Sequence, residues 1–199
     1  MKTVWKYISL LLLLLVFAGS AHGGPAGDFV KAARNQIGKT LVYDSHYQAL
    51  DYPNGDVPLE RGVCSDVVVR ALRSAFDLDL QKLVHEDMQK NIAAYPHRWG
   101  LTQPDKNIDH RRVPNLRTYF KRRKWSLPVS HRAIDYKPGD LVTCIVPPHL
   151  PHIMIVSDRK NSRGVPFVIH NIGAGVREED RLFEFEHTGH YRIVGIEKR

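Results

Sequence analysis

The hydrophobic pattern changes its period halfway along the chain, and this change limits the folds that the chain can adopt. From Cys64 to Phe76, apolar residues recur every three or four positions, which predicts a helix with one buried stripe. In the second half, short apolar runs bounded by turn residues predict strands, at Leu141–Val146, His152–Ser157, Pro166–Asn171 and Tyr191–Ile196. Helices followed by strands indicate an α+β domain, with N-terminal helices packed on a C-terminal antiparallel sheet.

Two more helical stretches are expected in the first half. Asp28 can cap a helix that ends at Gly38, and the segment from Leu80 to Ile92 is amphipathic. The loop before Cys64 contains several Pro and Gly residues, so the Cys64 helix has a marked start.

The first 23 residues have the composition of a secretory signal peptide. Lys2 and Lys6 form a basic start, Ile8–Phe17 is apolar, and small residues follow at 19–23. We therefore expect a signal peptide at 1–23 and a single domain at 24–199. The mature protein would be periplasmic or secreted, with no stable membrane insertion after cleavage.

The charge of the chain favours anionic partners. The formal net charge is +8, and it is +6 without Lys2 and Lys6. Export favours peptidoglycan or another anionic cell-envelope substrate over nucleic acid, for which no motif is present. No cofactor is expected, and no metal site either, because His149 and His152 lack further ligands at zinc spacing.

The two cysteines, Cys64 and Cys144, allow two interpretations. In an exported protein they could form a disulfide. Alternatively, Cys64 is a nucleophile in the first turn of its helix, where unpaired N–H groups and the helix dipole favour a thiolate. Cys144 lies in an apolar strand and would then be a small buried hydrophobe.

Two histidines on adjacent predicted strands could serve such a nucleophile, which needs a base and a group that orients the base. If the hairpin turns near Asn161, Ile155 opposes Phe167 and His152 opposes His170. Opposed residues share a face of the sheet, so the two imidazoles could meet. A slip of one residue would separate them.

The pattern resembles the NlpC/p60 superfamily of papain-like cysteine hydrolases. The resembling segments are Cys64 at a helix start, Pro138–Val142, Pro151–Val156 and Val168–His170. The resemblance implies a papain-like domain with Cys64 as nucleophile, His152 as general base and acid, and His170 as the orienting residue. It also implies an oxyanion site made by a backbone N–H near Cys64, with a hydroxyl from Tyr43 or Tyr47.

The mature chain is also similar to a narrower group of exported bacterial proteins of unknown function, the YijF-like family. The segments that carry this similarity are Tyr43–Tyr47, Gly62–Val67, Val84–Met88, Ile108–Leu116 and Gly189–Arg192. The usual cell-wall peptidases have Asp directly before the Cys and a small residue two positions after it. This chain has Val63 and Asp66 there, and Asp66 can either cap the helix or face the substrate.

A basic segment, residues 110–124, offers a second candidate surface. It could be a solvated helix, or a clamp in which Arg111 and Arg112 bind carboxylates or phosphates. Together these features favour an exported cysteine hydrolase that cleaves an amide bond, in peptidoglycan stem peptides. The alternatives are an acyltransferase or lipid-directed thiol hydrolase on the same fold, and a non-enzymatic wall-binding module. A polar cleft with Arg side chains would favour peptides, and a broad apolar groove would favour acyl chains.

Overall fold

The computed structural model describes residues 24–100 and 102–195. In this part, four α-helices accompany a six-stranded antiparallel sheet, which confirms the predicted α+β class. The expected signal peptide at 1–23 lies outside the described residues. Within the described residues, no helix has the length and apolar character needed to cross a bilayer.

The helices follow the apolar periodicity, with one difference at the N-terminus. The first helix begins at Pro25 rather than after Asp28, because Pro suits a first helical position, and it ends before Gly38. The second begins at Cys64, as predicted. The α-helices are α1 (Pro25–Arg34), α2 (Cys64–Phe76), α3 (Leu80–Asn91) and α4 (Val113–Arg122), and the 3₁₀ turns are η1 (Ile92–Ala94), η2 (Asp109–Arg111) and η3 (Ala133–Asp135).

The large sheet has the order β3-β8-β4-β5-β6-β7, and a separate pair, β1 and β2, is parallel. The prediction of a last strand at Tyr191–Ile196 is wrong for residues 192–195, because the strand ends at Tyr191, where it pairs with Leu141 at the start of β4, and Ile196 lies outside the described residues. The strands are β1 (Val42–Tyr43), β2 (Arg61–Gly62), β3 (Ser126–Leu127), β4 (Leu141–Val146), β5 (Leu150–Lys160), β6 (Pro166–Asn171), β7 (Val176–Glu179) and β8 (Glu186–Tyr191).

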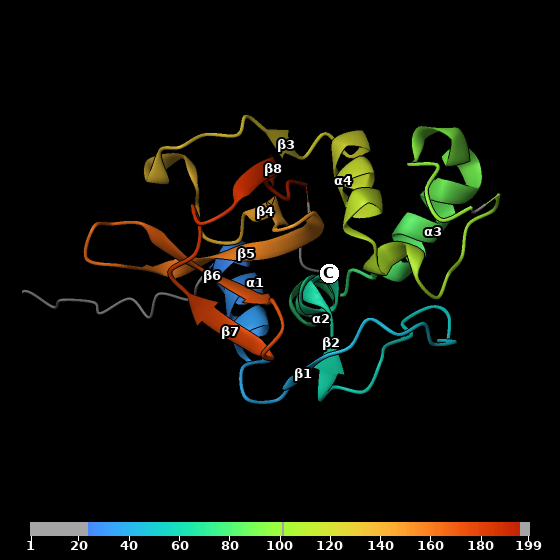
Figure 1. Cartoon of the computed structure of the whole chain (residues 1–199), viewed down its shortest axis with the longest axis horizontal. Helices are drawn as coiled ribbons and strands as arrows, with labels where there is room; N and C mark the ends of the chain where they lie inside the picture. The colour runs from blue at the N-terminus through green and yellow to red at the C-terminus, as the bar shows by residue number, and fades with distance from the viewer. Residues whose placement is uncertain (1–23, 101, 196–199) are drawn as a thin grey trace, which may run out of the picture.

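The central strand β5 divides the core into two layers. Ile153 and Ile155 pack with α1 and α2, and Met154 and Val156 belong to a smaller cluster on the opposite face with Leu182. Both faces of this strand are thus covered, which explains its unbroken apolar run. Figure 1 shows α2 beside the sheet and below α4, with α3 farther from the sheet, and α2 contacts β5, β6 and α3.

Candidate active site

Cys64 is the first residue of α2, and hydrogen bonds on both sides fix this helix start. The Val63 N–H donates to Asp66 Oδ2 at 2.7 Å, which caps the first turn. The Gly62 carbonyl accepts a hydrogen bond from Asn171 Nδ2 at 2.9 Å, at the end of β6. The nucleophile candidate is therefore held against the sheet, and the capping role considered for Asp66 is the one that it has.

The Cys64 thiol is almost buried, with 3% of the residue exposed. It interacts with the Ile153 N–H of β5 and with the Tyr43 hydroxyl. A cavity of about 210 Å³ reaches the thiol; besides Cys64 it is lined by Tyr43, Ser45, Val63, Trp99, Ile108, Arg111, Arg112, Val113, Pro114 and Pro151. The arrangement brings one of the two tyrosines proposed for the oxyanion site next to the nucleophile.

Burial controls the charge of this thiol. It raises the pKa of Cys64 to about 11, although the N–H groups of Ile153 and Ser65 act in the opposite direction. The expectation that the helix terminus favours the thiolate is thus wrong for this state, because desolvation outweighs the N–H groups. Burial and the nearby thiol also raise the pKa of Tyr43, so its hydroxyl keeps its proton and can donate it in a hydrogen bond.

His152 and His170 are in direct contact. Nε2 of His152 lies 2.8 Å from Nδ1 of His170, and both residues are buried. The predicted register is wrong by two residues, since Ile155 pairs with Ile169 rather than with Phe167. The cause is a turn centred beyond Asn161 and a register shift between Val156 and Lys160. A shift of two residues keeps every side chain on the same face of the sheet. His152 and His170 therefore still meet, as diagonal rather than directly opposed neighbours on β5 and β6.

Glu179, on the neighbouring strand β7, extends this pair into a chain. Its Oε2 lies 3.1 Å from Nε2 of His170. A carboxylate only accepts hydrogen bonds, so His170 donates from Nε2 and accepts at Nδ1. His152 must then donate from Nε2, which leaves its Nδ1 without a proton. Glu179 thereby selects the tautomer in which His152 can act as a base.

The histidines are neutral at neutral pH. Burial, with a smaller effect of His170, lowers the pKa of His152 to about 3. Burial also lowers the pKa of His170, against the opposing influence of Glu179. A neutral thiol and a neutral imidazole are the ground state of a general-base pair, in which the proton moves only as the nucleophile attacks.

Cys64 and His152 share no hydrogen bond among the described residues. The thiol instead contacts the N–H of Ile153, the next residue in the chain after His152. The structure therefore places the nucleophile candidate beside the backbone of the base candidate, with the thiol directed to other partners. Catalytic hydrogen bonds commonly tighten only when substrate is bound.

Asp66 and Arg111, both predicted as substrate or oxyanion candidates, are paired with each other. The guanidinium of Arg111 donates to both carboxylate oxygens of Asp66, at distances from 3.0 to 3.3 Å. It also donates to the carbonyls of Asp44 and His46, on the loop that follows Tyr43. This buried ion pair holds the loop over α2, so both residues have a structural role in this state.

Arg112 and Tyr47 take different positions. Arg112 lies over the ring of Trp99, 4.2 Å from its centroid, at the wall of the Cys64 cavity. The Tyr47 hydroxyl accepts a hydrogen bond from Asn107 Nδ2 at 2.7 Å, and Tyr47 does not line this cavity. Of the two tyrosines predicted for an oxyanion site, Tyr43 is the one that lies beside the Cys64 thiol.

Sequence reasoning missed Glu179 and Trp99. Glu179 belongs to a run of charged residues that gives no sign of a buried partner, and Trp99 lies in an aperiodic segment. Cys64 and Cys144 are both buried free thiols, so the disulfide interpretation does not apply to this structure. Burial raises the pKa of Cys144 to about 12.

Comparisons with known proteins identify relatives over most of the chain. Residues 30–193 match the family model DUF1287, described as a domain of unknown function. The chain is 59% identical over 160 residues to the uncharacterized protein YijF of Escherichia coli (strain K12), covering 80% of this chain and 78% of that protein.

Proposed function

The chain belongs to the DUF1287 family, in the group of YijF-like proteins, and we propose that it is an exported cysteine hydrolase of the NlpC/p60 type. Its reaction would be the cleavage of an amide bond in peptidoglycan stem peptides. The observation that carries this proposal is the chain from His152 through His170 to Glu179, beside a thiol at a helix start.

In the proposed reaction, the Cys64 thiol turns toward Nδ1 of His152 as substrate enters. The imidazole takes the thiol proton while the sulfur attacks the amide carbonyl, and the resulting imidazolium is stabilised through His170 and Glu179. The tetrahedral oxyanion would receive hydrogen bonds from the Ile153 N–H or the Tyr43 hydroxyl. His152 then protonates the leaving amine, and water attacks the thioester with His152 again as the base.

The walls of the Cys64 cavity favour a peptide substrate over an acyl chain. Arg112 lies at its wall, over the ring of Trp99, and a guanidinium suits peptide carbonyl or carboxylate groups better than an alkyl chain. An acyltransferase on the same fold would keep the same nucleophile and replace water by another acceptor.

Digestion of purified peptidoglycan tests the proposal. The mature protein should release peptide fragments that mass spectrometry detects, and the Cys64→Ala variant should release none. Cys144→Ala removes the other buried thiol and is the matched control, which should retain activity. Identical fragment profiles for the wild type and Cys64→Ala would refute the hydrolase proposal and favour a wall-binding module.

A further inference from the structure

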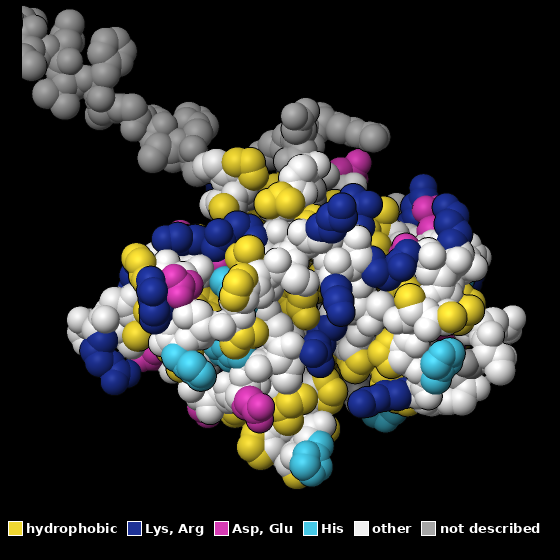
Figure 2. Space-filling model, turned by 90° about the horizontal axis from the view of Figure 1, so that it is seen from above, with side chains coloured by type: hydrophobic (Ala, Val, Ile, Leu, Met, Phe, Trp, Pro, Cys, Tyr) yellow, Lys and Arg dark blue, Asp and Glu magenta, His cyan; other side chains and the backbone are white. Residues whose placement is uncertain are grey.

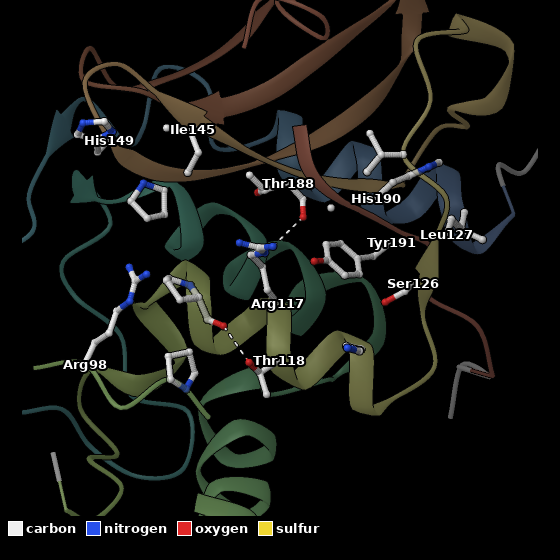
Figure 3. A pocket seen from close by; sticks show the side chains of 16 residues that line it. Arg98, Arg117, Thr118, Ser126, Leu127, Ile145, His149, Thr188, His190 and Tyr191 are labelled. Carbon is white, nitrogen blue, oxygen red and sulfur yellow. Dashed lines mark hydrogen bonds between the residues drawn. The ribbon is translucent and has the colours of Figure 1, made fainter. Parts of the chain in front are cut away.

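A second, larger cavity adjoins the cavity at Cys64. Its volume is about 650 Å³, and it shares Pro114 and Pro151 with the lining of the Cys64 cavity, so the two cavities are adjacent at these prolines. Figure 3 shows it between α4 and the end of the sheet. Its other lining residues are Pro96, Arg98, Arg117, Thr118, Lys121, Ser126, Leu127, Val129, Ile145, His149, Thr188, Gly189, His190 and Tyr191.

The charge of this cavity is positive and uncompensated. Arg98, Arg117 and Lys121 line it, and its lining includes no Asp or Glu. Within 24–100 and 102–195, none of these three side chains forms an ion pair, whereas most arginines there do, as Arg34 does with Glu178. Figure 2 shows Lys and Arg side chains across the middle of one face, where few acidic side chains lie. Cations that lack an acidic partner attract an anionic ligand.

Arg117 is held in place before any ligand arrives. Its Nη2 donates to the Thr188 carbonyl at 2.8 Å, as Figure 3 shows, and its buried Nε has no partner among the described residues. A guanidinium fixed by the backbone of β8 loses little freedom when it binds a carboxylate.

The rest of the lining selects among anions. Leu127, Val129 and Ile145 add apolar surface to the same cavity. A densely charged polyphosphate would leave this surface unused, whereas an aliphatic peptide side chain that ends in a carboxylate would contact both parts. Because this cavity adjoins the Cys64 cavity at Pro114 and Pro151, a peptide whose amide lies at Cys64 could place such a group in it.

We propose that this cavity is a substrate subsite in which Arg98, Arg117 and Lys121 bind a carboxylate of the peptide. The inference rests on the proposed function, and it names the substrate feature that the site would recognise. It also assigns a role to Arg117 and Lys121, which belong to the basic segment but do not line the Cys64 cavity.

Calorimetric binding to the full mature Cys64→Ala variant tests the subsite without turnover. The probes are a soluble stem tetrapeptide with free carboxylates and the same peptide with its carboxylates amidated. Amidation should weaken binding by about tenfold or more, as the loss of charge-assisted hydrogen bonds predicts. Adding Arg117→Gln should remove most of this difference. Adding Arg163→Gln, an exposed change of equal charge on the β5–β6 turn, should leave it intact.

The outcomes separate this inference from the proposed function. Equal affinity for the two peptides, or competition by inorganic phosphate stronger than by the free carboxylate peptide, would overturn the subsite even if wall fragments are released. Carboxylate-dependent binding with no cleavage by the wild type would support the subsite and refute the hydrolase. A difference that survives Arg117→Gln and Lys121→Gln together would also overturn the assignment.

Discussion

Nε2 of His152 and Nδ1 of His170 lie 2.8 Å apart, at positions of β5 and β6 that are diagonal neighbours. In this hydrogen bond His152 is the donor and His170 the acceptor, because Nε2 of His170 donates to the Glu179 carboxylate and its Nδ1 is left to accept. The free Nδ1 of His152 is therefore a proton acceptor, and the proposed chemistry depends on this tautomer.

The Glu179→Gln variant tests the tautomer. The amide can also donate, so His170 could accept at Nε2 and donate from Nδ1 to Nε2 of His152, which would leave the proton of neutral His152 on Nδ1. We expect the peptidoglycan-hydrolysis rate to fall by about tenfold or more, with a changed pH profile and little change in the melting temperature. The matched control is Glu178→Gln on the same strand, which removes an ion pair with Arg34 and should affect stability instead. Equal activity losses in both variants would contradict the role of Glu179.

The Tyr43→Phe variant tests the oxyanion contribution. The Tyr43 hydroxyl interacts with the Cys64 thiol, and its raised pKa keeps its proton in place. Loss of one oxyanion donor should reduce kcat by about 10²-fold with little change in KM. Tyr47→Phe, which removes a hydroxyl bonded to Asn107, should leave kcat nearly unchanged. An unaltered kcat in Tyr43→Phe would assign the oxyanion to backbone donors alone.

Stability should decrease as the pH falls below the range in which buried histidines are neutral. Burial lowers the pKa of both His110 and His152 to about 3, from an ordinary value of 6.5. Between these two values the unfolded chain binds more protons than the folded protein. The free energy of unfolding therefore decreases as the pH is lowered, by up to about 1.4 kcal/mol per pH unit for each histidine. Urea titrations from pH 6.5 to 4.5 measure this slope, and His110→Gln should reduce it. A slope that is the same in that variant would refute the contribution of His110.

The thiol reactivity of the free protein should also depend on pH. Because burial raises the pKa of Cys64 to about 11, alkylation by iodoacetamide should be slow at pH 7 and accelerate toward pH 10. Cys144, with a pKa of about 12, should react more slowly. The Cys64→Ala variant, in which Cys144 is the remaining thiol, measures the rate of Cys144 by itself. Rapid alkylation of Cys64 at pH 6 would contradict the neutral ground state.

Breaking the buried ion pair should destabilise the protein. Arg111→Met leaves the Asp66 carboxylate without its partner, at a site where both side chains are about 4% exposed. The expected loss is about 3–5 kcal/mol in the free energy of unfolding, measured by urea denaturation. The double variant Asp66→Asn, Arg111→Met removes both charges and should recover part of this loss. A double variant less stable than Arg111→Met would contradict the charge argument.

The elements near the site were predictable where a local pattern specifies them. The spacing of apolar residues in α2 places Cys64 at a helix start, and the bounds of β4 and β6 follow from bounded apolar runs. The β5–β6 register was not predictable, because a two-residue slip leaves the burial of Ile155 and Ile169 unchanged. The pairing of Asp66 with Arg111 spans distant segments, and the raised pKa of Cys64 depends on burial, so no local pattern encodes either.

Trapping the covalent intermediate tests the central claim most directly. Wild-type protein is mixed with soluble stem peptide, quenched in acid within milliseconds to seconds, and mapped by mass spectrometry. The account predicts an acyl group from the peptide on the fragment that contains Cys64, absent in Cys64→Ala and reduced in Tyr43→Phe. Cleavage of the stem peptide by the Cys64→Ala variant would contradict the account.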